Sequence, residues 1–197
     1  MTDDRAPHSA AEVLRLYDEA TASFGRRVAG VARNQWAAPT AYHGWSVGRL
    51  VGALTAEQAR VPALLAGAGP ELPAERAAAP EPTEPTATAA ADWVRAAEAA
   101  RTALAAPHAL ARTVRTADGE RPAVAYCARL ITELTVHTWD LAHATCQDPH
   151  LAPELVEFAL RESGALPLAA GDPQARLLGL CGRHPAPLSA LDPEVTG

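Results

Sequence analysis

Two side chains that could exchange protons or bind a metal lie four residues apart in the segment ELTVHTWDL at 133–141. Residues i and i+4 share one face of an α-helix, so a helix here places Glu133 and His137 one turn apart. A carboxylate and an imidazole in this arrangement can hold one divalent metal, or act as a general acid and base on a bound substrate. Either use predicts a pocket of the kind found in enzymes.

The helical register places this pair at the edge of an apolar face. At about 100° per residue the large apolar side chains form one arc, and Glu133, His137, Asp140 and Tyr126 follow its edge. We therefore expect partial burial, where a charge is costly unless it is paired, bound to metal or neutralised. A structural alternative stays open: Arg129 forms a surface pair with Glu133, and His137 is a hydrogen-bonded helix residue.

Composition limits the classes of partner. The 197 residues are enough for one large domain, and a net charge of -6 without a basic run argues against nucleic acid and anionic membranes. We expect a small-molecule substrate and a monomer or homodimer. No apolar run approaches the length of a membrane span, and the acidic start MTDDRAPHSAAE does not resemble a signal peptide, so we expect a cytoplasmic protein.

The three cysteines do not indicate a structural framework. Cys127, Cys146 and Cys181 are odd in number and far apart, and none is in a CxxC pair. Neither a disulfide scaffold nor a thiolate zinc site is indicated. We expect free thiols.

Helical periodicity between proline-rich joints predicts an all-α fold, since alternating β-branched residues are scarce. Ser9 opens a capping box for the first helix, and Ser46 is the expected N-cap of the second, in which Pro62 predicts a kink or an early end. The expected helices cover residues 9–34, 46–65, 89–105, 122–145 and 153–163.

The joints between these helices differ in character. The proline-rich stretch 67–88 predicts an extended crossover or a lid. Residues 110–115 could form one short strand or an irregular edge before the Asp118-Gly119 turn. We expect a helical bundle over 1–165 and a tail over 166–197, whose apolar segment RLLGLC at 176–181 packs back on the bundle.

Three blocks resemble a known family. QWAAPTAYHGWSV at 35–47, ELTVHTWDLAHAT at 133–145 and RLLGLCGRHP at 176–185 are similar to the DinB-like, mycothiol-dependent maleylpyruvate isomerase N-terminal family. The resemblance implies an antiparallel four-helix bundle with a divalent metal, usually zinc, bound between the second and last bundle helices. It also implies enzymes that attach, exchange or use a low-molecular-weight thiol, or isomerise small acids.

Most, but not all, of the site residues of this family have a counterpart in the sequence. Its carboxylate falls on Glu133 and its second histidine on His137, and the tryptophan and aspartate of the HxWDL pattern are Trp139 and Asp140. Its first histidine falls on Ala53, which cannot bind metal. Two protein ligands are fewer than the three usual in catalytic zinc sites, so we expect a weak or empty metal site.

Two residues could replace the missing ligand. His43 lies in the loop before the second helix, and Glu57 lies one turn beyond Ala53, where a solvated helix residue is the stronger interpretation. Asp140 could join the pair, but an aspartate in this pattern is more often a buried partner that orients the histidine.

Further side chains could bind the substrate. Trp45 could stack on a ligand or serve as a core anchor, and Arg183 could bind an acidic ligand or form a structural ion pair. The candidate substrate-binding residues are His43, Trp45, Asp140 and Arg183.

The sequence leads to three hypotheses. The first is an isomerase or cyclase in natural-product or small-acid metabolism, with Glu133 and His137 as a metal-free acid–base pair. The second is a mycothiol-dependent, metal-assisted transferase or isomerase with metal at Glu133 and His137. The third is a non-catalytic binding or regulatory protein. We expect no cofactor under the first hypothesis, and zinc or another divalent metal and mycothiol under the second.

Overall fold

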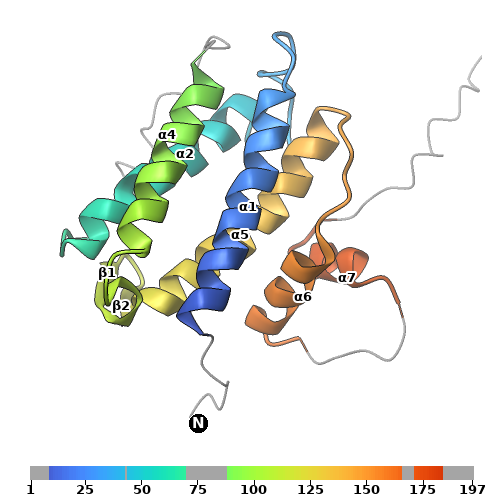
Figure 1. Cartoon of the computed structure of the whole chain (residues 1–197). Helices are drawn as coiled ribbons and strands as arrows, with labels where there is room; N and C mark the ends of the chain where they lie inside the picture. Colours follow the sequence, from blue (N-terminus) through green and yellow to red (C-terminus); the bar gives the residue numbers. More distant parts are fainter. Residues whose placement is uncertain (1–8, 43, 70–87, 166–170, 184–197) are drawn as a thin grey trace, which may run out of the picture.

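The computed structural model describes residues 9–42, 44–69, 88–165 and 171–183, and most of these are helical, as predicted. The long helices lie side by side, with the shorter helices near the C-terminal end of the described chain against one flank of the bundle (Figure 1). The elements in chain order are α1 (Ala10–Ala29), α2 (Val47–Leu65), α4 (Ala89–Leu104), the 3-10 turn η1 (Ala109–Ala111), β1 (Thr113–Thr116), β2 (Gly119–Pro122), α5 (Ala123–Ala144), α6 (Pro153–Glu162) and α7 (Pro173–Leu180).

The bundle has an up-down-down-up order, with α2 beside α4 and α1 beside α5 (Figure 1). Arg112, which follows α4, donates from Nη1 to the carbonyl of Leu65 at the C-terminus of α2 (3.1 Å), so these two helices end at the same level. Because α5 runs the other way, α2 and α5 face each other antiparallel. The predicted crossover lies mostly in residues 70–87, outside the described part of the chain.

The predicted caps are present, but the first helix ends earlier than predicted. The side chains of Ser9 and Ser46 accept hydrogen bonds from the backbone N–H of Glu12 and Arg49, each at 3.1 Å. The first helix ends at Ala29 rather than near residue 34, because the N–H of Gly30 already bonds to the last carbonyls of α1. Of the two outcomes considered for Pro62, a kink or an early end, the early end does not occur: a proline removes only one helical hydrogen bond, and α2 continues to Leu65, the expected last residue.

A hairpin precedes α5, where one short strand or an irregular edge was expected. Strands β1 and β2 pair antiparallel, from Thr113 opposite Pro122 to Thr116 opposite Gly119. The predicted turn at Asp118-Gly119 is present, and φ of +109° at residue 119 favours glycine there. Pro122 ends β2 just before α5 instead of lying in the first helical turn.

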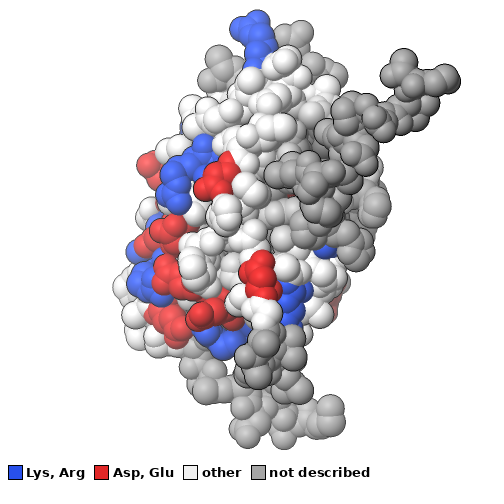
Figure 2. Space-filling model, turned by 90° about the vertical axis from the view of Figure 1, so that its right-hand side faces the viewer, with Lys and Arg blue, Asp and Glu red and all other residues white. Residues whose placement is uncertain are grey.

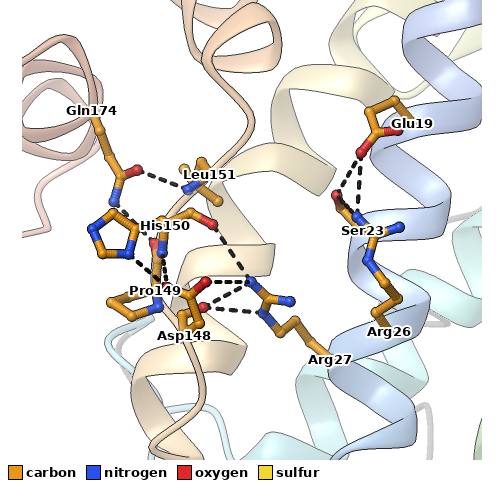
Figure 3. A network of polar contacts seen from close by, with 9 residues as sticks. All are labelled: Glu19, Ser23, Arg26, Arg27, Asp148, Pro149, His150, Leu151 and Gln174. Atoms are coloured by element: carbon orange, nitrogen blue, oxygen red, sulfur yellow. Dashed lines mark hydrogen bonds and ion pairs between the residues drawn. The ribbon is translucent and has the colours of Figure 1, made fainter.

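Helices α6 and α7 pack on the outer side of α5. Val136 of α5, Val156 and Ala159 of α6, and Leu177 of α7 form a small apolar cluster, so the segment 176–181 packs on the bundle as expected. Gln174 at the start of α7 accepts from the N–H of Leu151 and donates to the carbonyl of Pro149, each at 2.9 Å (Figure 3). These contacts set the position of the chain that follows α7.

The loop between α5 and α6, which contains Asp148, is also bonded to α1. The Arg27 guanidinium donates to the carbonyl of Asp148 from Nε (3.1 Å) and Nη2 (2.8 Å), as Figure 3 shows.

On the face drawn in Figure 2, acidic and basic side chains are interleaved instead of forming a patch of one sign. Within the described ranges, no helix is both long enough and apolar enough to cross a bilayer.

Candidate functional site

His137 lies on α5 against a buried carboxylate. Its Nδ1 atom is 2.8 Å from Oδ2 of Asp140, and the side chain of Asp140 is fully buried while that of His137 is 15% exposed. A carboxylate that accepts from Nδ1–H leaves Nε2 as the basic nitrogen of a neutral imidazole. Asp140 thus has the orienting position that the sequence suggested.

Arg183 holds the other side of the same carboxylate. It donates from Nε to Oδ1 of Asp140 (3.0 Å) and from Nη2 to Oδ2 (2.7 Å), and from Nη1 to the carbonyl of Cys181 (2.7 Å). Each guanidinium nitrogen of Arg183 therefore has a protein acceptor, which corresponds to the structural ion pair considered from the sequence. Direct contact between Arg183 and a substrate stays a prediction.

The ion pair keeps Asp140 ionised. Burial opposes ionisation of this carboxyl, but the hydrogen bonds from His137 and Arg183 outweigh it and hold the pKa of Asp140 below its usual range. Burial likewise opposes the charge of Arg183, and the bond to Asp140 raises its pKa above the ordinary value. The result is a stable negative charge against the imidazole of His137.

The loop before α2 contributes aromatic rings to the surroundings of His137 and Arg183. Tyr42 contacts His137 edge-on, with ring centroids 5.3 Å apart, and the Arg183 guanidinium lies 5.1 Å from the centre of its ring. The ring centroids of Trp45 and Tyr42 are 4.9 Å apart, and Trp45 packs partly buried against the core, while the Arg49 guanidinium lies 5.0 Å from the centre of the Trp45 ring. His43, between these rings in the sequence, lies outside the described residues.

Glu133 has a different set of neighbours. Its Oε1 accepts from Nη1 of Arg129 at 3.0 Å, one helical turn earlier on α5. Nη2 of the same guanidinium lies 3.8 Å from Oε1 of Glu57 on α2. Glu133 and His137 are thus on one face of α5, as predicted, but each is bonded to its own partner.

Glu57 is buried, and the sequence-based interpretation of a solvated residue is wrong. Its side chain is 8% exposed, and it accepts from the Tyr126 hydroxyl (2.8 Å) and from Arg60 (3.2 Å). Burial together with the neighbouring Glu57 carboxylate raises the pKa of Tyr126 above its ordinary value, so the hydroxyl remains a donor. The helical spacing already contained the signal, since Glu57 continues the buried series Leu50, Leu54, Val61 and Leu64.

The predicted edge positions are only partly correct. Glu133 and His137 are half-buried, as expected, whereas Asp140 and Tyr126 are fully buried. The hydroxyl of Tyr126 and the carboxylate of Asp140 can be that deep because each has a polar partner. Both contacts of the structural alternative, Arg129 with Glu133 and a hydrogen-bonded His137, are present.

The described residues do not fit the metal that the resemblance implies. Ala53 supplies no ligand from α2, and a cationic guanidinium is bonded to Glu133. In the described ranges, no group of three or more His, Cys, Asp and Glu side chains is arranged to hold a metal. We therefore derive no reaction step through a metal at this site.

A comparison with protein-family models identifies a family for most of the chain. Residues 5–142 match the family model of the mycothiol maleylpyruvate isomerase N-terminal domain. This range ends in α5, so it includes Ala53, Glu133, His137 and Asp140 but not Arg183.

Two curated relatives come from Mycobacterium tuberculosis: uncharacterized protein Rv0738 of strain H37Rv and uncharacterized protein MT0763 of strain CDC 1551. Each is 29% identical over 153 residues, which cover 78% of either chain. Crystal structures of the mycothiol-dependent maleylpyruvate isomerase and of its histidine-to-alanine mutant are similar in fold, with TM-scores of 0.65 and 0.63 at 18% and 19% identity. The alignments cover 79% of this chain and 68% of those.

Proposed function

We propose, since the chain belongs to the mycothiol maleylpyruvate isomerase N-terminal domain family, that it is a small-molecule enzyme in which His137 acts as general base. The observation that supports this role is the 2.8 Å contact between Nδ1 of His137 and the buried carboxylate of Asp140. This contact favours the tautomer with a basic Nε2 and stabilises the imidazolium that forms when Nε2 takes a proton. Asp140 and Arg183 are positioning residues for His137.

The reaction class that suits this arrangement is isomerisation or cyclisation of a small polar substrate. Nε2 of His137 removes a proton from a carbon next to a carbonyl group and returns it at another atom, so no external oxidant or reductant is required. Glu133, one turn away and paired with Arg129, supplies the second charged group of the proposed acid–base pair. Trp45 and Tyr42 provide flat apolar surface for the substrate.

A second candidate is a mycothiol-dependent transferase or isomerase. The family description and the solved structures of similar fold both name mycothiol. Under this proposal, mycothiol is the cofactor and the same imidazole accepts the proton of its thiol.

A non-catalytic binding protein is the third candidate. It is supported by Ala53 and by the ion pairs that engage Glu133 and Asp140. A small-molecule partner, the cytoplasm, and a monomer or homodimer remain our expectations under all three candidates.

An isomerisation assay distinguishes these candidates. Purified protein is given maleylpyruvate and related small unsaturated acids, with and without mycothiol, and product is followed by absorbance. We expect turnover that falls about 10²–10⁴-fold in His137→Ala. Turnover only with mycothiol favours the second candidate. No turnover of any acid under either condition contradicts both enzyme proposals, and equal turnover in His137→Ala contradicts the assignment of the base.

A further inference from the structure

Two acidic side chains from facing helices meet one arginine at the seam between α2 and α5. The Arg129 guanidinium is 3.0 Å from Glu133 of its own helix and 3.8 Å from Glu57 of α2. Ala53 precedes Glu57 by one turn, and Glu133 follows Arg129 by one turn. Since α2 and α5 are antiparallel, Ala53 and Glu133 lie at neighbouring levels of the same seam.

The buried carboxylate at this seam requires a positive charge nearby. Glu57 is 8% exposed, and a carboxylate at that depth is stable only when it is paired and hydrogen-bonded. Tyr126 and Arg60 each donate one hydrogen bond to it. Arg129 is 29% exposed and also lies over the Tyr126 ring at 5.7 Å, so its head group is positioned by contacts from both helices.

A divalent ion between these helices would have to compete with that guanidinium. It would need the carboxylate of Glu133, whose Oε1 already accepts from Arg129, and it would lie close to a positive charge that cannot be removed by deprotonation. The loss of a ligand at Ala53 and the presence of Arg129 are therefore two separate obstacles to metal binding.

We propose that the guanidinium of Arg129 takes the place of a metal ion at this site, linking Glu57 and Glu133 and excluding divalent cations. A histidine restored at position 53 is then insufficient to create a metal site. This inference does not depend on the proposed activity, because it concerns metal affinity.

Zinc binding to a set of purified variants tests the proposal. The set is the natural protein, Ala53→His, Ala53→His with Arg129→Met, and Ala53→His with Arg60→Met, titrated with Zn²⁺ against a competing chelator. We expect Ala53→His to bind zinc no better than the natural protein, and the double variant with Arg129→Met to bind one zinc at least about 10-fold more tightly. The variant with Arg60→Met is the matched control, since Arg60 pairs with Glu57 but is not bonded to Glu133, and it should show no gain.

Three results would overturn the proposal. They are tight stoichiometric zinc binding by Ala53→His alone, a folded double variant with no gain over Ala53→His, and an equal gain from Arg60→Met. Circular dichroism verifies folding. If Arg129→Met unfolds the chain, Arg129→Gln replaces it, because glutamine keeps hydrogen-bond donors and removes the charge.

Discussion

The imidazole of His137 and the carboxylate of Asp140 are three residues apart on α5, and their Nδ1 and Oδ2 atoms are 2.8 Å apart. The same buried carboxylate also accepts two hydrogen bonds from Arg183, which follows α7. The imidazole is thereby coupled to the C-terminal part of the described chain through one charged group. A change at Arg183 should therefore affect both the stability of the fold and the orientation of His137.

Replacing Arg183 by methionine should destabilise the protein by about 3–5 kcal/mol near pH 7, because Asp140 becomes a buried charge without its cationic partner. Urea unfolding followed by circular dichroism measures the difference. The matched control is Arg176→Met on α7, which should change stability by less than about 0.5 kcal/mol, since no ion pair in the described structure involves Arg176. Equal effects of the two substitutions would refute the coupling.

The pH dependence of stability should follow the ionisation of Asp140. Its pKa in the folded protein is below the unfolded value of about 3.9, so the native state binds fewer protons than the unfolded chain in that range. The stabilisation is therefore fully present above about pH 4 and is lost as the pH falls through the folded pKa. In Arg183→Met the folded pKa of Asp140 rises, so its difference from the unfolded pKa narrows and the Asp140 component of the acid-induced loss should become smaller.

Unfolding free energies measured between pH 2 and pH 7 test this for the natural protein, Arg183→Met and Asp140→Asn. The Asp140→Asn variant should lack this component of the acid dependence, because it has no carboxyl to titrate at that position. Identical acid profiles for all three proteins would show that Asp140 is not the group responsible.

Local features of the chain were sufficient to predict the helices and the face they share. The capping residues Ser9 and Ser46 were correct, and the spacing in α5 placed Glu133 and His137 together. Such predictions succeed because hydrogen bonds and side-chain spacing within one helix depend on neighbouring residues alone.

Partners from distant segments could not be predicted in the same way. Arg183 is 43 residues from Asp140, and only the packing of α7 on α6 brings it there. The burial of Glu57 was missed because glutamate is rarely buried in a protein core, although its position in the helical repeat places it on the inner face of α2. The end of α1 was placed too late because apolar spacing continued past Gly30, whose N–H closes the helix.

Removing the hydroxyl of Tyr126 should reveal how strongly Glu57 depends on it. Tyr126→Phe leaves the ring in place but takes one donor from a buried carboxylate, and a loss of about 1–3 kcal/mol in unfolding free energy is expected. Thermal and urea unfolding both report this change. Tyr42→Phe is the control, because Tyr42 is 39% exposed and its hydroxyl can remain hydrated, so its effect should be small. A neutral Tyr126→Phe would mean that the remaining partners of Glu57 are sufficient.

Two helical glycines should respond in opposite directions to the same substitution. A Cβ at Gly25 in α1 would lie 2.9 Å from Nε1 and 3.1 Å from Cδ1 of Trp93, a buried residue of α4 that also donates to the carbonyl of Thr21. Gly25→Ala must displace this indole, so we expect a loss of about 1–3 kcal/mol despite the better helix propensity of alanine. A Cβ at Gly179 in α7 meets no atom within 4 Å, so Gly179→Ala should gain about 0.5–1 kcal/mol. Urea unfolding of the two variants measures both changes in the free energy of unfolding. A stabilising Gly25→Ala would show that α1 and α4 can separate without cost at this contact.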